Sequence, residues 1–163
     1  MTAMYRRTVG FLLSVGLIGF AFTWQAAGQI PKLQTFEKGK LTIKTKSGHH
    51  DFKIEIARDP RQQAQGLMFR RRMAADAGML FLYRYPEPAR MWMKNTYIPL
   101  DLIYIDQTGK IVGSHQRAVP HSLEVITSKQ PVSAVLEVNA GTVSRLKVAI
   151  GDRVLHPAFR KNK

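Results

Sequence analysis

Two alternating segments joined by a turn lie early in the chain, Gly39-Lys-Leu-Thr-Ile-Lys-Thr-Lys-Ser-Gly-His-His-Asp-Phe-Lys-Ile-Glu-Ile-Ala57. Apolar side chains recur there at every second residue, at Leu41, Ile43, Phe52, Ile54 and Ile56. This period of two places the apolar side chains on one face of a strand and the polar ones on the other. The residues between the segments, Ser47-Gly48-His49-His50, have the composition of a turn. The stretch therefore predicts an antiparallel β-hairpin with one buried face.

Short elements are expected along the rest of the chain. Further strands are predicted at residues 78–83, 90–95, 100–105, 110–115, 134–138 and 153–156. Residues 85–88, with two prolines, are expected to end the first of these, and residues 116–131 are expected to form a loop. A helix from Asp59 to Gly66 and another from Thr142 to Leu146 are also expected. The pattern indicates a mainly β fold, a compact barrel- or sandwich-like single domain with one or two short helices.

The N-terminal segment has the pattern of a signal peptide. Arg6 and Arg7 are followed by the uncharged run Val9–Phe22, which at about 14 residues is shorter than the roughly 20 that span a bilayer. Small residues before Gln29 favour cleavage near Gly28. We therefore expect a signal peptide at 1–28, a linker at 29–38, a single β-rich domain at 39–158 and a basic tail at 159–163. The mature protein is expected to be exported, periplasmic or secreted, without a transmembrane span; an uncleaved anchor and the twin-arginine route are the alternatives.

Charge and cysteine content narrow the classes of partner. The chain has 25 Lys and Arg against 11 Asp and Glu, and no cysteine. Without Arg6 and Arg7 the mature part keeps 23 basic and 11 acidic residues, a formal net charge of +12. Such a charge attracts polyanions, and outside the cytoplasm these are anionic glycans and lipid headgroups rather than nucleic acid. A dispersed charge that maintains solubility is the alternative interpretation.

Several short motifs occur in a fixed order: Gly66-Leu-Met-Phe-Arg70, Gly78-Met-Leu-Phe81, Met91-Trp-Met-Lys-Asn-Thr96, Pro99-Leu-Asp101 and Ala134-Val-Leu-Glu137. With them the sequence resembles the domain-of-unknown-function family numbered 192, small bacterial and archaeal proteins, from about Leu41 to Val154. The resemblance implies a compact β-rich domain, often behind a signal peptide. It implies no activity.

The segment Arg90–Asp101 holds the candidate ligand-binding residues. In a strand, Trp92 and Lys94 would share one face, with Asp101 nearby if the corner at Pro99 folds back. Tryptophan offers a stacking surface and the polar side chains offer contacts to a sugar or an anion. The predicted ligand-binding set is Arg70, Trp92, Lys94, Asn95 and Asp101. The alternative is that Trp92 and the methionines are core and that Lys94 pairs with Asp101.

Glu137 is unusual because it lies in an otherwise apolar strand. A buried carboxylate is costly unless it is paired, so a salt bridge to Arg70 or Lys94 is the favoured interpretation. The functional interpretation is that Glu137 is a carboxylic acid with a raised pKa. An enzyme would use Asp101 and Glu137 as acid and base, joined by His121, but the sequence contains none of the familiar nucleophile, phosphate-loop or zinc motifs.

The pair Met91 and Met93 is a candidate copper(I) site, because thioether sulfur is a soft ligand. Methionine also fills protein cores, and no histidine pair has metal-binding spacing. No cofactor is expected. The leading hypothesis is thus an exported binding module for an anionic or carbohydrate ligand of the cell envelope, with a hydrolase-like enzyme or a copper-handling protein as alternatives.

Overall fold

The alternating segments form the expected hairpin in the computed structural model, which describes residues 33–159. Strand β1 (Glu37–Thr45) pairs antiparallel with β2 (Gly48–Ala57), and Leu41 lies opposite Phe52. The apolar side chains of both strands are buried, whereas the lysines between them are exposed. The prediction of a hairpin with one buried face is confirmed.

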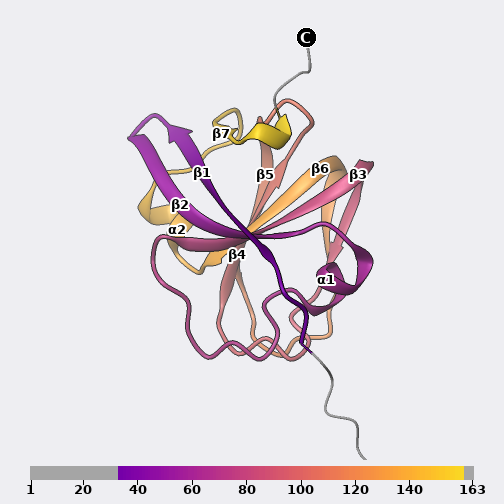
Figure 1. The fold of residues 1–163 in the computed structure, drawn as a ribbon. Coiled ribbons are helices and arrows are strands. Elements are labelled where there is room, and N and C mark those ends of the chain that lie inside the picture. The colour runs from indigo at the N-terminus through magenta and orange to yellow at the C-terminus, as the bar shows by residue number, and fades with distance from the viewer. Residues whose placement is uncertain (1–32, 160–163) are drawn as a thin grey trace, which may run out of the picture. The chain divides into compact units, whose positions relative to one another are not determined.

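The hairpin belongs to a seven-stranded sheet in the order β5-β4-β6-β3-β2-β1-β7 (Figure 1). The other strands are β3 (Ala77–Met91), β4 (Leu100–Ile105), β5 (Ile111–Ala118), β6 (Ile126–Asn139) and β7 (Arg153–Leu155). Only β2 and β3 are parallel among these named strands, and helix α1 (Pro60–Gln65) lies in the connection between them. The sheet curls into a half-barrel, so the mainly β, barrel-like prediction is confirmed.

The two edges of the sheet meet at one end. Lys110, just before β5, forms an isolated antiparallel bridge with Arg153 of β7. Val154 N donates to Gly109 O at 2.7 Å, and Ile111 N donates to Asp152 O at 2.8 Å. These backbone hydrogen bonds join the first and last strands of the order.

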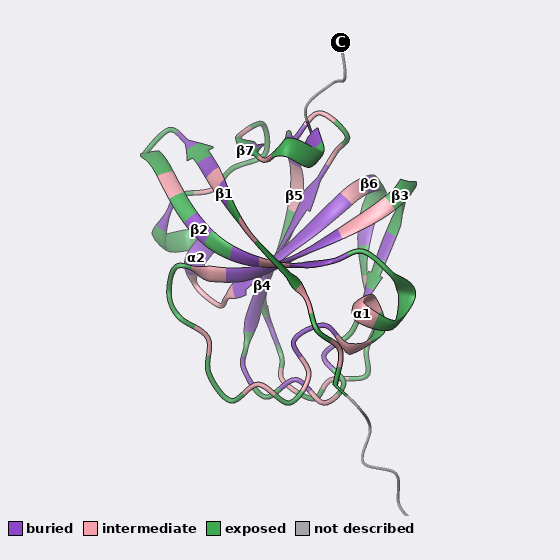
Figure 2. Ribbon diagram, in the orientation of Figure 1, coloured by how far each residue is buried: buried purple, intermediate pink, exposed green. Residues whose placement is uncertain are grey.

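Apolar side chains cover both faces of the central strands. The inner face of the half-barrel carries one cluster, to which every strand contributes, for example Leu41, Ile54, Leu80, Ile103, Ile111, Leu136 and Val154. A second cluster lies on the opposite face of β3, β4 and β6, where Leu67, Met93 and Ile98 from the connecting segments cover it. All six residues of β4 are therefore buried (Figure 2).

Strand β3 continues through the two prolines that were expected to end it. Its pairing with β6 shifts register between Leu82 and Glu87 and again between Pro88 and Arg90. Pro88 lies opposite Pro131, so two residues without an N–H occupy one irregular position of the ladder. The predicted strand at 90–95 is therefore wrong beyond Met91, and much of the predicted loop at 116–131 belongs to β5 and β6.

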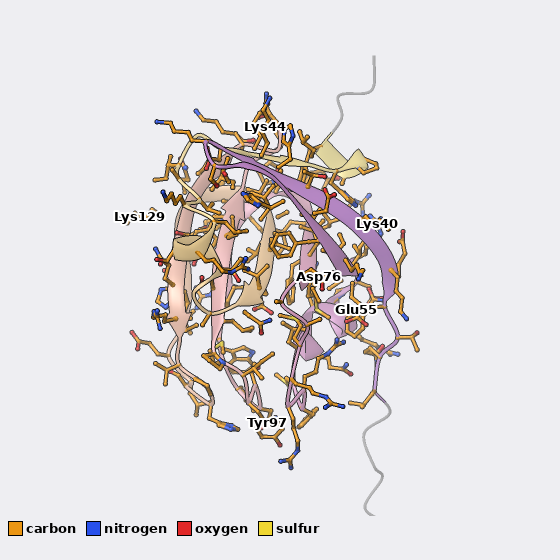
Figure 3. All side chains as sticks on the ribbon, turned by 90° about the vertical axis from the view of Figure 1, so that its left-hand side faces the viewer. Lys40, Lys44, Glu55, Asp76, Tyr97 and Lys129 are labelled. Carbon is orange, nitrogen blue, oxygen red and sulfur yellow. The ribbon has the colours of Figure 1, made fainter. Side chains whose placement is uncertain are left out.

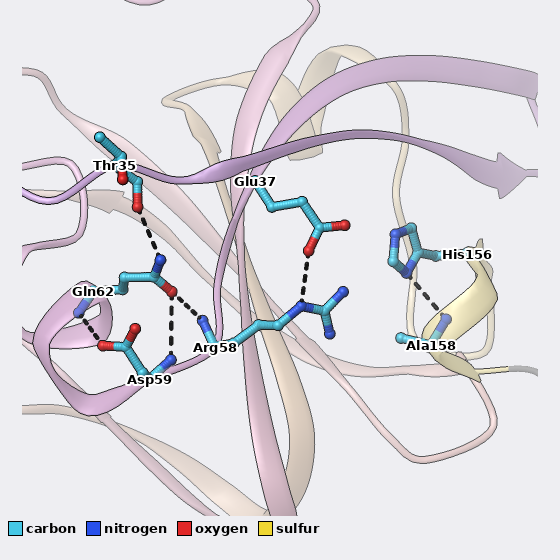
Figure 4. Close-up of polar contacts among 7 residues, drawn as sticks. All are labelled: Thr35, Glu37, Arg58, Asp59, Gln62, His156 and Ala158. Atoms are coloured by element: carbon cyan, nitrogen blue, oxygen red, sulfur yellow. Dashed lines mark hydrogen bonds and ion pairs between the residues drawn. The ribbon is translucent and has the colours of Figure 1, made fainter.

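Helix α1 begins as the sequence predicts. The Asp59 carboxylate accepts hydrogen bonds from the backbone N–H groups of Arg61 and Gln62, both at 2.9 Å. The Gln62 side chain accepts in return from Asp59 N, which completes the capping box, and the helix ends at Gly66 (Figure 4). The second helix, α2 (Thr142–Arg145), forms where it was expected, with Gly141 as its N-cap and Leu146 as its C-cap.

The expected signal peptide, the first residues of the linker and the end of the basic tail lie outside the described residues. Phe159, the first residue assigned to the tail, ends a 3-10 helix (Pro157–Phe159) and is buried against the inner cluster. Within residues 33–159, no helix combines the length and apolar character needed to cross a bilayer.

Candidate functional site

Glu137 lies in the middle of the sheet, and its side chain has no partner among the described residues. Its neighbours in register are Met79 on β3 and Leu102 on β4, and its side chain shares their face, which is covered by the second cluster. Only 4 % of its surface is exposed. No donor or cation of residues 33–159 hydrogen-bonds or pairs with its carboxylate. Burial raises the pKa of Glu137 to about 8, so the side chain is mostly a neutral carboxylic acid at neutral pH.

The salt bridge expected for Glu137 does not form. Arg70 instead pairs with Glu55 on β2. Lys94 places its ammonium 5.1 Å from the centre of the Trp92 ring. Both cations thus have other partners, and Glu137 has no ion pair within the part of the chain that the structure describes.

Glu137 opens into a cavity of about 310 Å³. Its walls come from the end of α1 and the following segment, from β3, and from the first residues after β3: Gln63, Ala64, Gln65, Gly66, Leu67, Met68, Phe81, Tyr83, Arg90, Met91, Trp92 and Thr96. Trp92 lines this cavity while exposing 46 % of its surface, so its ring is available to an incoming molecule. The cavity thus combines apolar and aromatic walls with one carboxylic acid, the usual composition of a small-molecule site.

Two tyrosines lie close enough to Glu137 to feel its charge. Burial, followed by the charges of Glu87 and Glu137, raises the pKa of Tyr83, whose hydroxyl lies 3.5 Å from the Met91 sulfur. Burial and the charge of Glu137 raise the pKa of Tyr104. The Tyr104 hydroxyl is fully enclosed and has no hydrogen-bond partner within the described chain. Sequence reasoning missed both tyrosines, because only the pairing of β3, β4 and β6 brings them near Glu137.

Asp101 is fully buried but has a structural role. Its two carboxylate oxygens accept from the backbone N–H groups of Arg117 and Val143, each at 2.9 Å. These bonds fasten the end of β5 and the first turn of α2 to β4. Leu102 is the residue opposite Glu137, and adjacent residues of a strand point to opposite faces. Asp101 and Glu137 therefore lie on different faces of the sheet and do not form an acid–base pair.

The remaining predicted site residues divide between the cavity and its surroundings. Met91 lines the cavity, whereas Met93 is almost fully buried in the second cluster. Asn95 lies in the loop after β3, where its carbonyl accepts from Phe69 N at 2.8 Å and its amide nitrogen approaches the Met68 sulfur at 3.9 Å. His121 packs edge-on against Tyr97. No group of three or more His, Asp or Glu side chains is placed to hold a metal within residues 33–159.

Solved structures of two bacterial proteins resemble this chain. One, from Sinorhizobium meliloti and described as a candidate transcription regulator, is 48 % identical with a TM-score of 0.75; the match covers 78 % of this chain and 99 % of that one. The other, from Novosphingobium aromaticivorans and of unknown function, is 37 % identical with a TM-score of 0.73, covering 74 % and 86 % of the two chains. No functionally curated protein matches. The DUF192 pattern, described as "Uncharacterized ACR", matches residues 41–156. The chain therefore belongs to the uncharacterised DUF192 family, as the ordered motifs predicted.

Proposed function

We propose that the protein is an exported, non-enzymatic binding module for a carbohydrate of the cell envelope, and that the sugar enters the cavity above Glu137. The observation that carries this proposal is the buried Glu137 carboxyl, which has no partner within residues 33–159 and shares its cavity with Trp92. A buried polar group without a protein partner is expected to find one in water or in a ligand.

The chemistry of the cavity suits a neutral sugar better than an anion. A protonated carboxyl donates one hydrogen bond and accepts others, as a sugar hydroxyl also does. The Trp92 ring offers an apolar face against which a pyranose can pack. The Lys94 ammonium lies over the indole, 5.1 Å from the ring centre, and Trp92 as a whole is 46 % exposed. An anion would have to lie beside an ionisable acid, with Arg90 as the one cation among the lining residues.

Export of the chain would bring this cavity to the carbohydrates of the cell envelope. The positive N-terminal region, the short apolar run and the small residues before Gln29 support a cleaved leader. The Sinorhizobium relative is described as a candidate transcription regulator. A regulator would act on nucleic acid in the cytoplasm, whereas a leader would carry this chain away from it, so we favour an envelope ligand.

Binding to neutral oligosaccharides tests the proposal. We expect the purified protein to bind a neutral envelope oligosaccharide in calorimetric titrations and Trp92→Ala to weaken binding by about tenfold or more, as for an aromatic anchor. Binding should also weaken above about pH 8 in the parent, because the ionised acid loses its donor, but not in Glu137→Gln.

Tyr85→Ala is the matched control, since Tyr85 is 69 % exposed on β3 and does not line the cavity. If neutral sugars do not bind, or if Trp92→Ala binds as the parent does, the proposal is wrong.

A hydrolase-like activity is the second candidate, and it rests on the same raised pKa. A carboxyl with a pKa of about 8 is suited to act as a general acid near neutral pH. Asp101 cannot assist, because both of its oxygens accept backbone hydrogen bonds on the other face of the sheet. Turnover of the bound sugar by the parent, abolished in Glu137→Gln while binding persists, would identify an enzyme rather than a binding module.

A further inference from the structure

We propose that the outer face of the β1–β2 hairpin, together with β7, is a second binding surface, and that its partner is a linear polyanionic glycan. This surface is separate from the Glu137 cavity and shares none of its lining residues. The hairpin buries its apolar side chains inward, so its polar side chains are left on the outside.

The outer face is hollowed rather than flat. A groove of about 980 Å³ runs over β1, β2 and β7, and its charged and titratable lining residues are Lys40, Lys44, His49, Asp51, Lys53, Asp76, Arg153 and His156. A second hollow of about 540 Å³ shares Lys40 and Lys53 with it and adds Lys38, Glu55 and Arg70. Because Lys40 and Lys53 line both hollows, the two hollows lie next to each other. Figure 3 shows Lys40 part-way along β1 and Lys44 near the end of the same strand.

Of the two acids of the groove, Asp76 is paired with a cation and Asp51 is hydrogen-bonded to a hydroxyl, whereas several cations have no ion-pair partner among the described residues. Lys53 pairs with Asp76 at 3.0 Å, and Asp51 accepts from the Thr42 hydroxyl at 2.6 Å. Lys40 and Lys44 have no ion-pair partner within residues 33–159, and both are exposed.

Arg153 is a further cation of the groove, and His156 adds little charge to it. Among the described residues, the Arg153 guanidinium donates only to Thr108, at 3.1 Å to its carbonyl. Burial, assisted by the charge of Arg58, lowers the pKa of His156, so this ring is mostly neutral at neutral pH. The positive charge that a partner would meet therefore comes mainly from Lys40, Lys44 and Arg153.

The spacing of these cations suits a chain of regularly placed anions. Lys40 and Lys44 lie four residues apart on one strand face, roughly 13 Å at 3.2–3.4 Å per residue. Arg153 is the cross-strand neighbour of Lys44 on β7. A linear polymer with repeating sulfate, phosphate or carboxylate groups can contact all three at once and release its counterions.

The hollow shape of this surface favours a linear glycan over other polyanions as its partner. A planar lipid bilayer touches protruding side chains and does not enter a groove. Single-stranded nucleic acid is held by bases stacked on exposed aromatic rings, and the outward-facing positions of β1 and β2 carry lysine, threonine, histidine and acids instead. The expected export of the chain also places it among envelope glycans.

Binding to dextran sulfate, with uncharged dextran of the same length as reference, tests this surface. We expect the full-length protein to bind dextran sulfate at low salt and not dextran. The combined variant Lys40→Gln, Lys44→Gln and Arg153→Gln should weaken binding by about 10- to 100-fold and lower the slope of log K against log salt by roughly two to three.

The matched control is Arg84→Gln, Lys129→Gln and Arg145→Gln, which removes the same charge from exposed positions outside the groove. Its affinity for dextran sulfate should fall less than threefold, because dispersed exposed charges contribute little at a distance from the groove. Equal losses in the two triple variants would show a diffuse charge effect and overturn the proposal.

Two further probes distinguish the partner. Tighter binding to phosphatidylcholine vesicles containing phosphatidylglycerol, or to a short DNA duplex, than to dextran sulfate would overturn the assignment to a glycan. Trp92→Ala should leave dextran sulfate binding unchanged, so failure of the sugar cavity and failure of this groove can be told apart.

Discussion

As pH rises from about 4.5 to about 9, the free energy of unfolding of the parent protein should fall by roughly 3–5 kcal/mol more than that of the variant Glu137→Gln. The folded protein raises the pKa of Glu137 from 4.5 to about 8 by burying it. Between these values the unfolded chain releases a proton that the folded protein keeps, so stability declines as pH rises and levels off once both states are ionised. Glutamine does not titrate, and the variant should lack this decline.

Urea unfolding of both proteins across this pH range measures the effect. Asp76 and Asp106 have pKa values lowered in the folded state, so their contributions are lost as pH falls through the acid range. Those contributions are shared by parent and variant and cancel in the difference. The exposed Glu124→Gln is the control and should follow the parent at every pH. Parallel curves for Glu137→Gln and the parent would contradict the raised pKa.

The second large effect is expected at Asp101, the other buried carboxylate, where substitution should lower the free energy of unfolding. Asp101→Ala should lower the free energy of unfolding at neutral pH by roughly 3–5 kcal/mol, because it leaves two backbone N–H groups without an acceptor. These groups belong to Arg117 and Val143, and Asp101 itself is fully buried. Glu137→Gln removes no such bond and should not be destabilising at that pH.

Asp101→Asn provides the matched comparison. Asparagine keeps the volume and one acceptor oxygen, but its amide group faces the second backbone N–H as a donor. We expect its stability in urea titrations to lie between those of the parent and Asp101→Ala. A loss of less than about 1 kcal/mol for Asp101→Ala would show that the two hydrogen bonds contribute little.

Features encoded by neighbouring residues were predictable from the sequence. The hairpin follows from alternation within a few residues, and the start of α1 follows from Asp59, Pro60 and Gln62 alone. The path of β3 was not predictable in this way. Whether Pro88 ends that strand or lies in a bulge depends on the facing Pro131, more than forty residues away in the chain.

The candidate site was predictable only in part, for the same reason. The sequence singled out Trp92 and Glu137, which the structure brings to one cavity. It also grouped Asp101 with them, but the register that pairs Leu102 with Glu137 puts Asp101 on the other face. Arg70, Lys94 and Asn95 do not line the cavity. The Lys94 ammonium instead lies over the ring of Trp92, which does. Side-chain identity indicated unusual residues, whereas strand register decides which of them meet.

The bridge between Lys110 and Arg153 also bears on how the protein behaves in concentrated solution. A free strand edge offers unpaired N–H and C=O groups to other molecules and can seed aggregation. Here β7, one end of the sheet, is only three residues long. At the other end, β5 is hydrogen-bonded at Ile111, and the polar run His115-Gln116-Arg117 precedes its last residue, with a positive φ of 57° at Arg117. Because these two edge strands are short, hydrogen-bonded to each other or irregular, they offer a second molecule few backbone groups to pair with. We therefore expect this sheet to resist edge-to-edge association, although the chain has no disulfide.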